Sequence, residues 1–143
     1  RGWRHVRVTE RRTKVDWAHA LRDFLNEFYA EAEKIVLVMD NLNTHSPGSF
    51  YEAFEPEQAR RLTERLEIHY TPKHGSWLNI AECELSVFTR QCLNRRIESE
   101  SQLRREALAW STHRNAQQRG VEWQFTSKDA RIKLKRLYPQ IQD

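Results

Sequence analysis

One stretch, residues 35–45, constrains the fold of this chain more than any other. It begins with five consecutive apolar residues, from Ile35 to Met39. β-Branched and long aliphatic side chains in such a run are typical of a central strand that is covered on both faces. Asp40 follows the run directly and leads into a polar loop. Because open α/β sheets bind ligands at the edge where their strands end, this pattern predicts a carboxylate at a ligand-binding edge.

A second acidic candidate, Glu82, lies at the start of a helix expected over residues 78–95. The helical wheel of this segment places Glu82 beside an apolar stripe. The stripe consists of Leu78, Ala81, Leu85, Phe88 and Cys92. An Asp at the end of a strand and a Glu on a helix can together hold divalent metal ions for phosphodiester chemistry.

The other segments predict an α/β chain. Residues 3–9 alternate as a strand does, and Thr13 with Asp16 forms a capping-box pattern that begins a helix ending near Ala32. A strand, a helix and the strand over residues 35–39 would form a parallel β-α-β unit. Further elements are expected as short helices over 47–54 and 56–66, a strand over 66–70, and capped helices starting after Ser99 and Thr126.

Composition is that of a globular chain that is polar overall, with 38% hydrophobic and 31% charged residues. Its 143 residues suffice for one domain spanning 1–143. No apolar run is long enough to cross a membrane and no signal peptide is visible, so a cytoplasmic, nucleoid-associated location is expected. Cys83 and Cys92 point to opposite sides of one expected helix, which predicts reduced thiols.

Positive charge is concentrated in the C-terminal third. Residues 90–136 contain twelve Lys or Arg and five Asp or Glu, whereas the remainder contains twelve basic and fifteen acidic residues. A basic region in a chain with a carboxylate site suits a polyanionic substrate. A solvated helix surface is the alternative explanation for the same charges.

Three short motifs occur in a characteristic order: Asp40-Asn41-x-x-x-His45, Tyr70-Thr71-Pro72 and Asn79-x-x-Glu82. In this order they resemble the DDE transposases, most closely the IS630 branch of the Tc1/mariner-like superfamily. The resemblance covers approximately residues 3–139. It implies an α/β, RNase H-like fold of the DDE transposase/integrase type, with a mixed sheet flanked by helices. The first strands of that sheet are expected to lie upstream of this chain, which would be a partial catalytic domain.

The resemblance also implies the site. In that family three acidic residues bind two Mg²⁺ (or Mn²⁺) ions, and Asp40 and Glu82 match the second and third of them as catalytic and metal-binding residues. The first normally lies on an upstream strand, so this chain alone is expected to be inactive. Three polar residues are expected around the carboxylates, namely Asn41, His45 and Asn79. Three further residues are candidate DNA contacts, namely Lys73, His74 and Arg90.

The implied function is metal-dependent hydrolysis and strand transfer at transposon ends, with transposon and target DNA as partners and a homodimer left open. Two alternatives remain: another RNase H-like nuclease, or a non-catalytic DNA-binding or oligomerisation remnant of a decayed or split transposase. Simpler roles exist for individual residues as well. Asp40 could simply cap the turn after its strand. Glu82 could simply interact favourably with the dipole at the N-terminus of its helix. His45 could have no role other than ordering its loop.

Overall fold

A computed structural model describes residues 2–72, 79–118, 120–122, 124–133 and 135. The chain divides into two compact units. The larger unit is Val6–Trp110, and the smaller combines Arg1–His5 with Ser111–Asp143. The prediction of one domain over 1–143 stays a prediction. Within the described residues, no helix has both the length and the apolar character needed to cross a membrane.

Helix α1 (Lys14–Phe28) begins at the predicted capping box. The Thr13 side chain accepts a hydrogen bond from the backbone N–H of Asp16, and the Asp16 carboxylate accepts one from the N–H of Thr13. The helix ends at Phe28, earlier than predicted, because Tyr29 leaves the helical conformation with φ −138°. Ala18 and Leu25 lie in the core, whereas Phe28 is 38% exposed.

The sheet consists of β1 (Ile35–Met39) and β2 (Leu66–Tyr70), whose bounds match the predicted strands. They pair in parallel, with Ile35 opposite Leu66 and Met39 opposite Tyr70. The chain passes between them through α2 (Gly48–Ala53) and α3 (Pro56–Glu64). These two helices confirm the predicted short helices over this segment.

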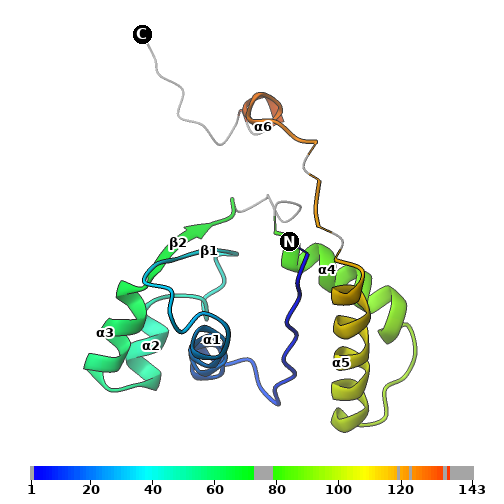
Figure 1. The fold of residues 1–143 in the computed structure, drawn as a ribbon, viewed down its shortest axis with the longest axis horizontal. Coiled ribbons are helices and arrows are strands. Elements are labelled where there is room, and N and C mark those ends of the chain that lie inside the picture. The colour runs from blue at the N-terminus through cyan, green and yellow to red at the C-terminus, as the bar shows by residue number, and fades with distance from the viewer. Residues whose placement is uncertain (1, 73–78, 119, 123, 134, 136–143) are drawn as a thin grey trace. The chain divides into compact units, whose positions relative to one another are not determined.

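Helices α1, α2 and α3 all lie on the same side of the two strands (Figure 1). A core between them and the sheet is formed by Ala18, Leu25, Phe50, Ala59, Leu62 and Leu66. On the opposite face, Val36 and Val38 are 62% and 60% exposed. The prediction that this strand is covered on both faces is therefore wrong for the part of the chain that the structure describes. A run of apolar residues alone does not show whether a second layer packs on a strand.

The predicted strand over residues 3–9 is also absent from the described residues, as is a mixed sheet. Burial alternates along this segment as in a strand, and Val6 and Val8 pack on an apolar cluster. A strand additionally needs a neighbour for its backbone hydrogen bonds, and β1 pairs with β2 instead. The chain is thus a helix-rich α/β protein with a small parallel sheet.

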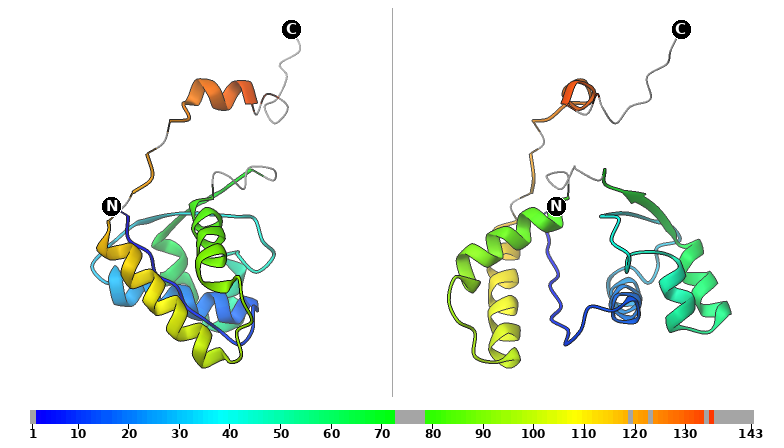
Figure 2. Two further views of the ribbon diagram at one scale, coloured as in Figure 1. Left: turned by 90° about the vertical axis from the view of Figure 1, so that its right-hand side faces the viewer. Right: turned by 180° about the vertical axis from the view of Figure 1, so that it is seen from behind.

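A second core lies between α4 (Ile80–Phe88), which continues as the π-helix η2 (Thr89–Leu93), and α5 (Glu100–Ala116). The axes of α4 and α5 cross at an angle (Figure 2). Phe88 and Trp110 pack with ring centroids 5.1 Å apart, and the indole N–H of Trp110 donates to the Gln91 side chain. Leu85, a member of the predicted apolar stripe, is 49% exposed. Both cysteines are thiols, as predicted.

The smaller unit contains the end of α5 and helix α6 (Ser127–Lys133). Thr126 and Asp129 form the predicted capping interaction at the start of α6. The side chain of Asn115 exchanges two hydrogen bonds with the backbone of Arg4, at 2.7 and 2.8 Å. These bonds tie the N-terminal residues to the end of α5.

Candidate active site

Asp40 is the first residue after β1, at the carboxyl end of the two-stranded sheet. The parallel ladder reaches the residue before it, because the N–H of Thr71 donates to the carbonyl oxygen of Met39 at 2.8 Å. The Asp40 side chain retains 35% of its exposure. A carboxylate is therefore presented to solvent at the sheet edge where ligands bind in parallel α/β structures.

His45 is hydrogen-bonded to Asp40. In the turn after β1, the N–H of His45 donates to the carbonyl oxygen of Leu42 at 2.8 Å. This turn brings His45 back toward the end of the strand. Nδ1 of His45 then lies 2.6 Å from Oδ1 of Asp40. Because an ionised carboxylate only accepts hydrogen bonds, the imidazole N–H is the donor. In the described part of the chain, the other oxygen of Asp40, Oδ2, makes no hydrogen bond.

Two aromatic residues that were not predicted to be site residues, Trp17 and Tyr70, contact His45. The indole of Trp17 on α1 stacks on the imidazole, with ring centroids 5.5 Å apart and planes inclined by 29°. The hydroxyl of Tyr70, the last residue of β2, donates to the carbonyl oxygen of His45 at 3.1 Å. Tyr70 could have been found from the parallel pairing of the two strands, which places it opposite Met39 and beside Asp40. No local pattern points to Trp17, which precedes His45 by 28 residues.

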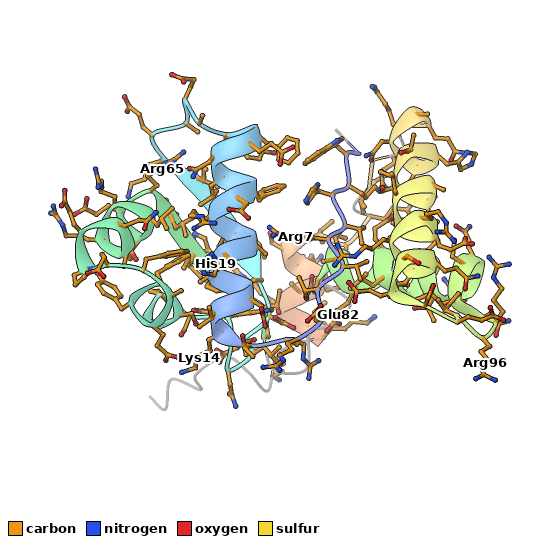
Figure 3. The ribbon with its side chains drawn as sticks, turned by 90° about the horizontal axis from the view of Figure 1, so that it is seen from below. Arg7, Lys14, His19, Arg65, Glu82 and Arg96 are labelled. Atoms are coloured by element: carbon orange, nitrogen blue, oxygen red, sulfur yellow. The ribbon has the colours of Figure 1, made fainter. Side chains whose placement is uncertain are left out.

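Glu82 lies in the first turn of α4 and is exposed; Figure 3 labels it. The helix begins at Asn79, whose side-chain oxygen accepts a hydrogen bond from the N–H of Ala81 at 3.1 Å. Asn79 therefore acts as the N-cap that positions the turn carrying Glu82. A carboxylate in this first turn is also favoured by the helix dipole.

The remaining predicted site residues are either exposed or outside the described residues. Asn41 is exposed in the loop that follows Asp40. Arg90 is exposed in η2. The two other candidate DNA contacts, Lys73 and His74, lie outside the described residues.

The donor chemistry of Asp40 fits a hard divalent cation, which prefers carboxylate oxygens. Oδ2 is available for such a contact while Oδ1 is held by His45. Within the residues that the structure describes, no group of three or more His, Cys, Asp or Glu could hold a metal ion. The described residues therefore bring His45 to Asp40 but do not gather Glu82 into a three-ligand group with them. The shared site of Asp40 and Glu82 stays a prediction.

One comparison with known proteins identifies the family of this chain. A family model described as DDE superfamily endonuclease matches residues 1–104, a range that contains β1, β2 and all of α4. Neither the curated proteins nor the solved structures contain a match. Endonuclease domains of this kind generally use divalent metals and act on DNA. Since the match covers most of the 143 residues, the chain belongs to the DDE superfamily endonucleases.

Proposed function

We propose that this chain is part of the RNase H-like catalytic domain of a DNA transposase of the IS630 branch of the Tc1/mariner-like superfamily. In the intact protein it takes part in phosphodiester hydrolysis and strand transfer at transposon ends. Asp40 and Glu82 are the catalytic and metal-binding carboxylates. The partners are transposon-end and target DNA.

One observation carries this proposal: Asp40 lies at the carboxyl end of a parallel strand with its carboxylate held by His45, in a chain of the DDE endonuclease family. The order of three motifs supports the finer assignment, because Tyr70 at the end of β2 and Glu82 at the start of α4 follow Asp40 as they do in the IS630 pattern.

Each of the two carboxylates is at least partly exposed to solvent. The Asp40 side chain is partly exposed, and His45 restrains its Oδ1. Glu82 is exposed on a turn held by the Asn79 cap. Mg²⁺ or Mn²⁺, when bound by such groups, supplies Lewis-acid stabilisation of the charge that develops on phosphodiester oxygens. The contribution of this chain is to supply anionic oxygen ligands and to keep one of them oriented.

Binding of Mn²⁺ by the purified chain tests the assignment. We expect weak binding in the wild type, since two carboxylates gain little from a strongly hydrated ion, and its loss in Asp40→Asn and in Glu82→Gln. Glu27→Gln is the matched control, because Glu27 is an exposed carboxylate on α1 that is not part of the proposed site. Binding that persists in Asp40→Asn at wild-type strength would refute the role of Asp40.

A nicking assay tests the activity in the full-length protein that contains this chain. Supercoiled DNA carrying the transposon ends should be cleaved with Mg²⁺ or Mn²⁺ by the wild type and by Glu27→Gln. Cleavage should fall by several orders of magnitude in Asp40→Asn and in Glu82→Gln. Equal cleavage by all four proteins would contradict the proposal.

A further inference from the structure

We propose that Trp17 is a positioning residue for Asp40 and acts through the imidazole of His45, with Tyr70 fixing the backbone of the same loop. This inference rests on the proposed function, since it assigns a role in orienting the carboxylate that the proposal makes a metal ligand. Its geometric part, the orientation of His45 by Trp17, can be tested without any metal.

His45 is held from three directions by segments far apart in the sequence. Its Nδ1 is hydrogen-bonded to Asp40, one face of its ring is stacked on Trp17, and its carbonyl oxygen accepts from Tyr70. The side chain is only 24% exposed as a result. Neither the Asp40 loop nor α1 could fix the imidazole without the other.

The stacking is needed because a histidine ring turns easily about χ2, whose energy minima are broad. A hydrogen bond of 2.6 Å to Asp40 requires Nδ1 to lie in one narrow range of ring orientations. With a flat indole packed against the imidazole face, rotation of the ring would separate the two surfaces. Trp17 therefore favours the orientation in which the imidazole of His45 bonds to Oδ1 of Asp40 and not to Oδ2.

Trp17 is itself well supported. Its indole packs against Phe50 of α2, with ring centroids 5.2 Å apart, and Phe50 is completely buried. Its backbone N–H donates to the carbonyl oxygen of Thr13 at 3.1 Å, so the capped first turn of α1 carries it. Successive contacts thus connect the core to the carboxylate: Phe50 packs on Trp17, Trp17 stacks on His45, and His45 bonds to Asp40.

Tyr70 restrains the backbone rather than the ring. It is the register partner of Met39, so its position is set by the sheet that also places Asp40. Its hydroxyl reaches across to the carbonyl oxygen of His45 at 3.1 Å. The loop is therefore attached to the carboxyl ends of both strands, and we expect removal of this bond to loosen the loop without disturbing the core.

The experiment compares Trp17→Leu, Trp17→Phe and Tyr70→Phe with the wild type. Phe54→Leu is the core control, because Phe54 packs against the same core and stacks on Phe50. The first measurement is the NMR signals of the His45 ring protons in the metal-free chain. We expect an upfield ring-current shift in the wild type, its loss in Trp17→Leu, a smaller shift in Trp17→Phe, and no change in Phe54→Leu.

The second measurement is the Mn²⁺ dissociation constant. Loss of groups that orient a ligating side chain typically weakens metal binding about 10- to 100-fold. We expect a weakening of about that size in Trp17→Leu, a smaller one in Tyr70→Phe, and near-wild-type binding in Trp17→Phe and Phe54→Leu. A merely structural role for Trp17 would instead make Trp17→Leu and Phe54→Leu behave alike, which would overturn the proposal.

The outcomes separate this inference from the proposed function. If Asp40→Asn abolishes Mn²⁺ binding but Trp17→Leu changes neither the His45 signals nor the affinity, the positioning role is refuted and the proposed function stands. If Asp40→Asn leaves Mn²⁺ binding unchanged, the proposed function fails, and the role of Trp17 toward a metal ligand fails with it. Should Trp17→Leu not fold, His45 signals in Trp17→Phe identical to those of the wild type would refute the stacking contact.

Discussion

At the scale of single residues, a charged contact within the larger unit connects its N-terminal segment to α1. Asp23 on α1 accepts hydrogen bonds from the guanidinium groups of Arg7 and Arg22, at 2.7 Å and 2.6 Å. Arg7 belongs to the N-terminal segment whose valines pack on the second core. Hydrogen bonds from Arg7 and then Arg22 lower the pKa of Asp23 below its ordinary value of 3.8. Asp23 therefore fastens this segment to α1.

We predict that Asp23→Asn lowers the free energy of unfolding at neutral pH by up to about 1 kcal/mol, the usual upper range for an ion pair this exposed. A carboxylate with a lowered pKa stabilises the fold above its unfolded-state pKa, and this contribution is lost as pH falls through the folded-state pKa. Urea unfolding across this pH range measures the difference. If the difference in free energy of unfolding between the wild type and Asp23→Asn stayed constant until Asp23 is fully protonated, the ion-pair explanation would be contradicted.

Glu64→Gln is the control for that experiment. Glu64 pairs with Arg60 one turn away on α3, and both side chains are more than 60% exposed. Such an i,i+4 pair contributes only about 0.3–0.5 kcal/mol. We expect its removal to cost less stability than removal of the Asp23 interaction, which connects two segments.

At the scale of elements, α1 is the helix that serves both the core and the candidate site. Ala18 and Leu25 face the sheet, while Trp17 reaches the loop after β1. Figure 3 labels two residues of α1, Lys14 at its start and His19 one turn later. Arg65, which precedes β2, is labelled near the other end of the helix. At that far end, Arg65 donates to the carbonyl oxygens of Tyr29 and Ala32, which ties the end of α1 to the start of β2.

We predict that Thr13→Ala destabilises the chain by about 1 kcal/mol, the usual cost of losing an N-cap side chain. Because the N–H of Trp17 bonds to the carbonyl oxygen of Thr13, fraying of this turn should also reduce the ring-current shift of His45. Chemical denaturation and NMR measure the two effects. Thr13→Ser, which keeps the hydroxyl, should retain both, and a destabilised Thr13→Ser would show that the cap is not the cause.

The same cap makes the start of α1 sensitive to pH. Hydrogen bonds from the side chain and backbone of Thr13 lower the pKa of Asp16 from 3.8. The stability from this interaction is complete at neutral pH and is lost as the pH falls through the lowered pKa. The destabilisation caused by Thr13→Ala should therefore shrink in acid.

At the scale of the whole molecule, charge is distributed unevenly along the chain. Among the described residues of the basic C-terminal third, Arg104 pairs with Glu100 and Arg95 pairs with Glu106. Arg96, labelled in Figure 3, and Arg105 are exposed without an ion pair among the described residues. When arginines of a protein neutralise DNA phosphates, counterions are released, and such binding is strongly salt-dependent.

We predict that this chain binds DNA with little sequence preference and that the double substitution Arg96→Gln, Arg105→Gln weakens binding. The slope of log affinity against log salt concentration should become shallower by about one unit for each phosphate that the variant no longer neutralises. Fluorescence anisotropy at several salt concentrations measures both quantities. Arg60→Gln on α3 is the control, since Arg60 already pairs with Glu64. An unchanged slope in the double variant would place the DNA-binding residues elsewhere.

Short-range signals in the sequence were enough to predict most elements and part of the site. Both strands have their predicted bounds, and the caps at Thr13 and Thr126 begin the predicted helices. Such features depend on residues within one or two turns of each other, so adjacent sequence carries them. The same is true of the Asp40–His45 pair, because one tight turn connects the two residues.

Long-range packing decided the rest. Three features depend on which distant segments meet. They are the exposure of Val36 and Val38, the pairing of β1 with β2 rather than with residues 3–9, and the stacking of Trp17 on His45. An apolar run has the same sequence whether one or two layers cover it, and a tryptophan on a helix has the same local pattern whether it meets a leucine or an imidazole. These interactions exist only once α1, the loop after Asp40 and the end of β2 are brought together by the common core.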